Sequence, residues 1–184
     1  MYTDEHAADR GRHDALLVRG RRPAPKGNRG KPLYAVVNYA KQRRAMRRLL
    51  CHVCGKSAHR NELGVLWLLD DVAANCEPGW PEREVSVHPP VCLGCAGKAV
   101  EECPELHKMG FTALRVSDPE EYGYYGTLYT RDLSAPGSPF PAFVRDRETL
   151  AFDDPLLPWL HCAQSAMALN GVTVIKLDDL ISAP

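Results

Sequence analysis

The sequence lacks any long hydrophobic run, and no apolar stretch exceeds Val65–Leu69 in length. A membrane-spanning helix needs about 20 consecutive apolar residues, so the chain is not expected to cross a bilayer. The N-terminus is polar and charged where a secretory signal peptide requires an apolar segment. We therefore expect a cytoplasmic protein with no membrane partner.

The sequence also lacks net charge, because 23 Lys and Arg residues balance 23 Asp and Glu residues. The two signs are nevertheless segregated. Residues 1–60 carry 15 Lys and Arg against four acids, a net charge of +11, and residues 61–184 carry the other 8 against 19, a net charge of −11. A basic segment on a neutral chain indicates an anionic partner, which is a nucleic acid or an acidic protein surface, the chain's own acidic half included.

The even set of cysteines that a disulfide framework requires is absent, because the chain has seven. Four of them form two C-x2-C pairs, Cys51 with Cys54 and Cys92 with Cys95, separated by residues 55–91. Cytosolic thiols stay reduced, and each pair supplies two thiolates to a tetrahedral ion. The spacing predicts one structural Zn²⁺ held by all four cysteines, with two unrelated reduced pairs or a redox dithiol as the alternatives.

Four thiolates fill the coordination shell, so this ion is expected to stabilise the fold and to do no Lewis-acid chemistry. The segments Arg-Arg-Leu-Leu-Cys51-His-Val-Cys54-Gly and His88-Pro-Pro-Val-Cys92-Leu-Gly-Cys95 resemble uncharacterised bacterial proteins with two Cys pairs. The resemblance covers roughly Lys41 to Val116 and implies no activity.

Other metal-ligating residues lack pair spacing. Three histidines near the pairs are expected to be hydrogen-bonded or to face solvent instead of replacing a thiolate: His52, His59 and His88. Cys103 and His107 stand at i and i+4, which can place them on one helix face. A second metal bound by these two residues with Cys76 stays open, although a buried structural cysteine is the favoured interpretation.

A catalytic constellation is absent as well. His161 and Cys162 are expected on a helix, where adjacent side chains point about 100° apart and do not form a dyad. The acids occur as neighbours, such as Asp70 and Asp71, which is typical of a solvated surface. We therefore expect no enzymatic activity and identify no small-molecule substrate.

Two Cys pairs in a treble-clef frame also occur in HNH endonucleases, which resemble one another by an Asp-His or His-His pair on the hairpin. Here Val87 precedes His88, and the helix expected after Cys95 brings no Asn or His before His107. The nuclease interpretation is therefore rejected.

The fold class predicted is α+β, with a basic arm and a single zinc-stabilised domain. Residues 1–32 mix Arg and Lys with Gly and Pro, which predicts a flexible arm. Residues 33–184 are predicted to form the domain. A helix over residues 39–50 would carry four arginines on one flank: Arg43, Arg44, Arg47 and Arg48.

A treble-clef-like zinc module is expected over about residues 41–110. Residues 64–69 and 84–88 have the pattern of strands that pair as a hairpin. A helix over residues 96–108, shortened or kinked at Pro104, follows the second Cys pair. Knuckle, hairpin, knuckle and helix is the order of a treble clef.

Residues 111–184 predict a small appended antiparallel sheet and a C-terminal helix. Five apolar or alternating segments have the pattern of strands: 111–116, 122–130, 143–144, 149–152 and 172–177. The helix is predicted over residues 156–169, with Asp154 as its N-cap, Pro155 in the first helical position and Asn170-Gly171 at its end.

The basic segments carry the functional hypothesis, because Arg contacts phosphate with little sequence preference. We predict a zinc-stabilised nucleic-acid-binding or regulatory protein, although no base-reading motif is present. The alternative is an adaptor or assembly subunit whose basic arm docks on an acidic protein. The residues predicted to contact the partner are Arg21, Arg22, Arg43, Arg44, Arg47 and Arg48.

Overall fold

The structure, a computed structural model, describes residues 2–20, 37–71, 78–131, 133–134 and 141–181. The chain divides into two compact units. Unit 1 comprises residues 1–43 and 123–164, and unit 2 comprises residues 44–122 and 165–184. This division differs from the predicted arm and single domain, because one helix and two long strands each continue from one unit into the other.

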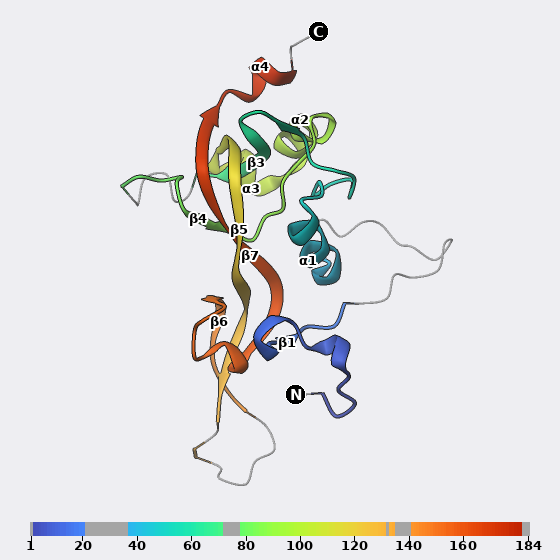
Figure 1. Ribbon diagram of the computed structural model, residues 1–184, viewed down its shortest axis with the longest axis vertical. Coiled ribbons are helices and arrows are strands. Elements are labelled where there is room, and N and C mark those ends of the chain that lie inside the picture. The colour runs from blue at the N-terminus through green and yellow to red at the C-terminus, as the bar shows by residue number, and fades with distance from the viewer. Residues whose placement is uncertain (1, 21–36, 72–77, 132, 135–140, 182–184) are drawn as a thin grey trace, which may run out of the picture. The chain divides into compact units, whose positions relative to one another are not determined.

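The three shared elements are helix α1 (Tyr39–Arg48) and strands β5 (Phe111–Thr130) and β7 (Leu160–Ile175) (Figure 1). Unit 1 adds short elements: 3-10 helices η1 (Ala7–Asp9), η2 (Arg12–Asp14) and η3 (Leu157–Trp159), and strands β1 (Leu16–Leu17) and β6 (Ala142–Ala151). Unit 2 adds strands β2 (Arg60–Asn61), β3 (Gly64–Asp70) and β4 (Glu84–Ser86), and helices α2 (Leu93–Glu102), α3 (Pro104–Met109) and α4 (Leu177–Ile181).

The strands are hydrogen-bonded in the order β1-β7-β5-β3-β2, with β4 on β7 and β6 on β5. The β1–β7 pair is parallel, whereas β3–β5, β4–β7 and β5–β6 are antiparallel. Helices together with a large mixed sheet confirm the predicted α+β class. Within the described ranges, no helix is long and apolar enough to span a membrane.

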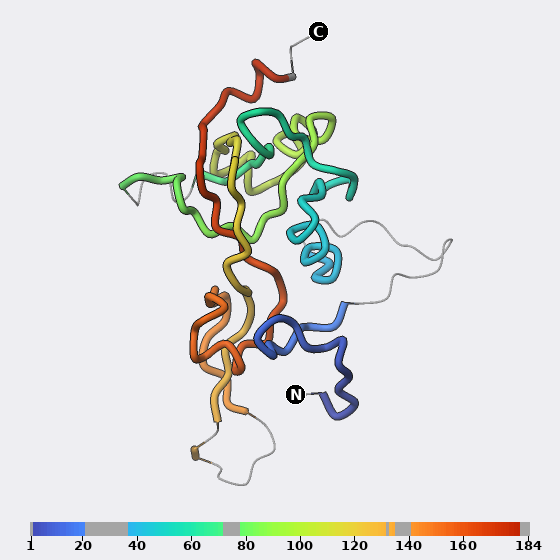
Figure 2. The backbone as a smooth tube through the Cα atoms, viewed as in Figure 1, coloured from blue at the N-terminus to red at the C-terminus, as the bar shows by residue number. Residues whose placement is uncertain are grey.

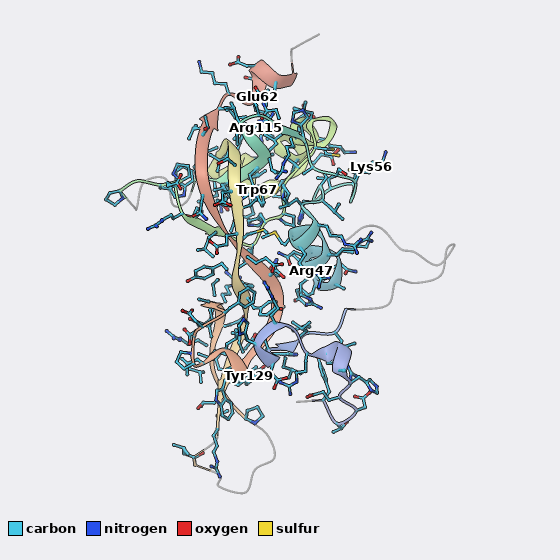
Figure 3. All side chains as sticks on the ribbon, viewed as in Figure 1. Arg47, Lys56, Glu62, Trp67, Arg115 and Tyr129 are labelled. Carbon is cyan, nitrogen blue, oxygen red and sulfur yellow. The ribbon has the colours of Figure 1, made fainter. Side chains whose placement is uncertain are left out.

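Strand β3 is buried on both faces, which explains its unbroken apolar sequence. Val65, Trp67 and Leu69 pack in one hydrophobic cluster of unit 2, together with residues of α1, β5 and β7. Leu66 and Leu68 face a second cluster, which includes residues of α2 and α4 and the first cysteine of the first pair. The predicted buried strand is therefore confirmed as the centre of unit 2, where Trp67 is labelled in Figure 3.

The predicted hairpin between residues 64–69 and 84–88 is wrong. Strand β3 pairs with β5, from Val65 opposite Val116 to Asp70 opposite Phe111. Strand β4 pairs with β7 instead. The first half of β5 pairs with β3 from Val65 to Asp70, whereas β4 has only three residues.

The strands predicted at 111–116 and 122–130 are halves of one 20-residue strand, β5. The register of β5 with β6 shifts between Gly126 and Leu128 and again between Leu128 and Tyr129, which marks a bulge or irregularity in the pairing. Gly126 also lies so close to the His161 carbonyl that a side chain would clash with that backbone. The segments predicted at 143–144 and 149–152 likewise merge into β6.

The predicted helix over residues 156–169 is wrong, because these residues form η3 and most of β7. Asp154 does act as a cap, because its carboxylate accepts the Leu156 N–H at 2.8 Å. Only one turn of 3-10 helix follows it. Burial then alternates along β7, with Leu160 and Cys162 buried and His161 half-buried. That period of two is the signature of a strand.

The break expected at Pro104 is confirmed. Helix α2 ends at Glu102, Cys103 adopts extended backbone angles, and α3 begins at Pro104. Proline is accepted in the first turn of α3 because its missing N–H would have no helical partner there.

The prediction of a flexible arm over residues 1–32 is wrong for residues 2–20, which fold in unit 1. The Arg19 guanidinium binds Asp9 at 2.7 Å and Asp4 at 2.9 Å, and it lies 4.2 Å from the centre of the Tyr2 ring. Arg10 binds Glu5 at 2.8 Å. The few acids of the basic segment are therefore used to neutralise its own arginines. Residues 21–32 lie outside the described residues.

A first prediction concerns Asp9. The Arg19 guanidinium and the His6 backbone N–H hold the pKa of Asp9 well below its usual range. A lowered folded-state pKa means that the carboxylate stabilises the fold above about pH 4, and that this contribution is lost as the pH falls. We expect Asp9→Asn to lower the melting temperature at pH 7 and to flatten its acid dependence between about pH 5 and 2. An acid dependence equal to that of the wild-type protein would contradict this.

A second prediction compares two leucines. Leu114 on β5 has no exposed surface, whereas Leu133 is 82% exposed. We expect Leu114→Ala to lower the free energy of unfolding by about 3 kcal/mol, because it leaves a cavity in the core of unit 2. The same substitution at Leu133 is the control and should change stability by less than about 0.5 kcal/mol. Urea unfolding followed by circular dichroism measures both.

Candidate metal centre and basic surface

The two Cys pairs converge in unit 2. The four sulfur atoms of Cys51, Cys54, Cys92 and Cys95 all lie within 4.8 Å of one another, and they form the only such metal-ligating group among the described residues. The Sγ atoms of Cys54 and Cys92, from different pairs, are 3.8 Å apart. These four residues can therefore hold a metal ion.

The first pair sits on a tight loop directly after α1. The Cys51 N–H donates to the Lys56 carbonyl at 2.7 Å, and the Gly55 N–H donates back to the Cys51 carbonyl at 2.8 Å. Gly55 has a φ of 71°, a left-handed conformation that glycine adopts without steric cost. The loop thereby folds the Cys54 thiol back toward the Cys51 thiol.

The second pair begins α2. Cys92 is the N-cap residue, and its carbonyl accepts the N–H groups of Cys95 and Ala96, each at 3.0 Å. Helix geometry thus places the Cys95 side chain one turn from that of Cys92. The positive end of the helix dipole stabilises negative charge near these residues and opposes the effect of burial on their thiols.

The backbone of Leu66 on β3 holds the two pair-bearing segments together. The Leu66 N–H donates to the His59 carbonyl at 2.9 Å, and the Leu66 carbonyl accepts the Val91 N–H at 3.0 Å. The His59 N–H in turn donates to the Val91 carbonyl at 3.0 Å. A further bond runs from the His52 N–H to the Pro90 carbonyl at 2.8 Å. The convergence of the cysteines is therefore fixed by the main chain.

The four thiols differ in their surroundings. Cys51 is buried, with 1% of its surface exposed, and belongs to the hydrophobic cluster on the second face of β3. Cys92 and Cys95 are half-buried, and Cys54 is exposed. The Lys56 backbone N–H lowers the pKa of the Cys54 thiol to about 7, whereas burial raises the pKa of Cys95 to about 12 and also raises that of Cys92. A bound cation would hold all four as thiolates.

Among the neighbouring histidines, the His59 ring and the His88 backbone carbonyl make hydrogen bonds outside the cysteine group. His59 Nδ1 lies 2.8 Å from a guanidinium nitrogen of the fully buried Arg115, which confirms the expected hydrogen-bonded state of His59. The His88 carbonyl accepts the indole N–H of Trp67 at 2.6 Å. Burial and the Arg115 charge both lower the pKa of His59. A neutral His59 can accept a hydrogen bond from Arg115.

The other cysteines do not join a metal-ligating group in the described part of the chain. Cys103 lies half-buried between α2 and α3, and Cys76 is outside the described residues. Cys162 is buried and its thiol donates to the Leu160 carbonyl at 3.3 Å, while the His161 ring meets the Tyr2 hydroxyl at 3.0 Å. Each side chain therefore has a partner other than its neighbour, and both residues lie on strand β7 and not on the predicted helix.

The predicted arginine flank is divided by the structure. Arg43 is half-buried and its guanidinium donates to backbone carbonyls of unit 1, including those of Ala163 at 2.6 Å and Val18 at 2.9 Å. Arg43 therefore has a structural role in unit 1. An arginine on a solvent-exposed side of the helix would not make these backbone contacts. Arg21 and Arg22 lie outside the described residues.

The remaining arginines of α1 are exposed and lie in unit 2 with an exposed lysine on the first cysteine loop. We call this set the basic surface: Arg44, Arg47, Arg48 and Lys56. Figure 3 labels Arg47 on α1 and Lys56 on the loop that follows. Lys56 is placed by backbone bonds, because the Leu50–Ser57 bridge and the Cys51–Lys56 bond return the loop to the end of α1.

The basic surface is not neutralised within the described residues, where no carboxylate lies within ion-pair distance of any of its four members. Some other cations of the chain form ion pairs, namely Arg10 with Glu5, Arg19 with Asp9, and Arg145 with Glu148. Arg47 and Arg48 occupy the last turn of α1, where a cation also stabilises the helix dipole. The helix dipole is thus a structural reason for the positive charge of Arg47 and Arg48. It gives no reason for that of Arg44 and Lys56, and it does not neutralise the basic surface.

Lys56 is not among the residues predicted to contact the partner, although it lies beside them in the basic surface. The signal available in the sequence is an absence of acids, since none occurs between Asp14 and Glu62. This acid-free segment includes all four residues of the basic surface.

No protein-family model matches the chain, and no solved structure is significantly similar to it. The function is therefore inferred from the metal centre and the basic surface themselves.

A third prediction tests the metal centre. Cys92→Ser removes one of four converging thiolates, so we expect bound metal to fall from one ion per chain to a small fraction of that, with loss of cooperative thermal unfolding. Cys103→Ser, which changes a half-buried cysteine outside the group, is the control and should keep the metal. Elemental analysis of both purified proteins gives the answer. A Cys92→Ser protein that retains its metal and its fold would refute the site.

Proposed function

We propose that this chain is a zinc-stabilised nucleic-acid-binding protein, with a regulatory and non-enzymatic role, in which the basic surface contacts phosphate. The observation that carries the proposal is the exposure of Arg44, Arg47, Arg48 and Lys56 without acidic partners among the described residues. The three arginines precede the metal-ligating loop and Lys56 lies on it, so the metal centre would hold the backbone of this surface in place.

Zinc fits the donor set of the metal centre. Tetrahedral Zn²⁺ with Zn–S bonds of about 2.3 Å requires sulfur atoms about 3.8 Å apart. The Cys54 and Cys92 sulfurs are separated by 3.8 Å, and all four lie within 4.8 Å of one another. A set of four cysteines is a structural type of zinc site, and with no open coordination position it supplies folding energy.

The chain order around this centre supports a treble-clef-like module. The first Cys loop is followed by the short β2–β3 hairpin, in which Arg60 pairs with Val65 and Asn61 with Gly64. The second pair then opens α2. The hairpin of the module is thus β2–β3, and zinc would tie the loop after α1 to the start of α2.

Phosphate is the ligand class that the basic surface fits best. Three guanidinium groups offer planar, forked donors for phosphate oxygens, and Lys56 adds a compact charge. Contacts of this kind bind the nucleic-acid backbone with little sequence preference and release bound counterions. The expected activity is therefore salt-dependent binding to the nucleic-acid backbone, with little preference for base sequence.

The supporting geometry reduces the entropy lost on binding. Arg47 and Arg48 project from the final turn of α1, and hydrogen bonds of residues 49–51 with 56–58 hold Lys56 at the end of the same helix. A rigid backbone presents the four cations together, so only their side chains need to become ordered. A cytoplasmic setting, where thiols stay reduced, suits this design.

A fourth prediction tests the proposal by fluorescence anisotropy with a labelled duplex of about 20 base pairs. Affinity should fall steeply between about 50 and 200 mM salt. Arg47→Ala should weaken binding at every salt concentration and reduce the slope of log affinity against log salt by about 1.

Arg145→Ala is the matched control, because Arg145 is also exposed but pairs with Glu148 in unit 1. Its binding curve should overlay that of the wild-type protein. Absence of binding to duplex and single strand at low salt would overturn the proposal, and would leave an acidic protein as the partner of the basic surface.

A further inference from the structure

Cys54 is the one ligand of the candidate metal centre that solvent reaches freely. The structure leaves Cys54 exposed, Cys92 and Cys95 half-buried and Cys51 buried. Oxidants act on accessible thiolates, and a redox-sensing cysteine is typically exposed with a second cysteine close by. The four ligands are therefore unequal toward a small oxidant, and attack begins at Cys54.

Cys92 is placed to complete a disulfide with Cys54. Their sulfur atoms are 3.8 Å apart, and a bond requires an approach of about 1.8 Å. Neither residue lies inside a regular element, because Cys54 is on the first loop and Cys92 is the N-cap of α2. Cys51 is held in the hydrophobic cluster of β3 and is the least able to move.

We propose that Cys54 is an oxidation site for peroxides, that Cys92 is its resolving partner, and that the resulting disulfide switches off the basic surface by releasing the metal. The last part rests on the proposed function, whereas the oxidation and the release do not.

The chemistry balances with hydrogen peroxide as the oxidant. The Cys54 thiolate attacks one peroxide oxygen, forming a sulfenic acid and releasing hydroxide. The Cys92 thiolate then attacks the Cys54 sulfur, forming the S–S bond and displacing a second hydroxide. Each sulfur is oxidised by one electron, and the peroxide is reduced by two.

The consequence for the fold follows from the ligand count. A disulfide between Cys54 and Cys92 removes two of four thiolates, and Cys51 and Cys95 alone do not close a tetrahedral shell. The disulfide keeps the loop from Cys51 to Lys56 joined to the start of α2, but it draws the Cys54 and Cys92 sulfur atoms about 1.8 Å closer together than they are now. Lys56 lies two residues after Cys54 on this loop, so the movement of Cys54 and the loss of the ion between the two pairs change the arrangement of Lys56 relative to the arginines of the basic surface.

The test treats the full-length zinc-loaded chain with increasing hydrogen peroxide and follows free zinc with a chromogenic chelator. We expect one zinc released for every two thiols lost, and peptide mass mapping should find Cys54 joined to Cys92. A reductant with added zinc should restore the original metal content. Cys103→Ser should release zinc with the same peroxide dependence, because its thiol is outside the group.

Two outcomes would overturn the proposal. One is zinc retention at peroxide concentrations that fully oxidise an equimolar small thiol. The other is release accompanied by disulfides within the pairs, Cys51 to Cys54 or Cys92 to Cys95. Zinc release with the Cys54–Cys92 bond, but with duplex binding unchanged by oxidation, would overturn the switch.

The two proposals fail separately. Zinc release and disulfide mapping involve no nucleic acid, so they stand if the reduced chain binds no duplex and only the proposed function falls. Salt-dependent duplex binding by a chain that keeps its zinc under peroxide would leave the proposed function and remove this inference.

Discussion

The candidate metal centre depends on the two hydrogen bonds made by the backbone of Leu66. One goes to the segment after the first Cys pair and the other to the segment before the second. Leu66 lies on β3, which is buried on both faces. The Leu66 side chain packs in the hydrophobic cluster that also contains Cys51. Strand β3 therefore brings the two cysteine-bearing segments close together before a metal binds. Figure 2 draws the described parts of the chain between the pairs, residues 55–71 and 78–91, in teal to green.

Charge is the second organising constraint. The four acids of the basic N-terminal segment lie between Asp4 and Asp14, and they pair with Arg10 and Arg19 inside unit 1. Arg43 is likewise used internally, through backbone carbonyls. The acid-free stretch that follows leaves the exposed cations of α1 and Lys56 without such compensation among the described residues. Exposed positive charge of this kind attracts polyanions.

The oxidation site and the basic surface share the loop of residues 51–56. Residues 51–56 carry two metal ligands, the exposed Cys54 and the backbone bond that positions Lys56. A change in the oxidation state of Cys54 would therefore act on the basic surface through one short segment. Cys51, buried at the other end of this loop, would keep that segment attached to the core while its outer part responds.

The sequence by itself determined the α+β class, the four cysteines, the exposed arginines of α1 and the break at Pro104, because spacing and local periodicity specify each of them. Only the tertiary structure decided that residues 160–169 are a strand, since β5 supplies the partner that overrides a plausible capping signal at Asp154. It also decided that β3 pairs with β5 and not with β4, and that Arg43 and Arg19 serve the fold. These outcomes depend on contacts between distant segments, which no local pattern encodes.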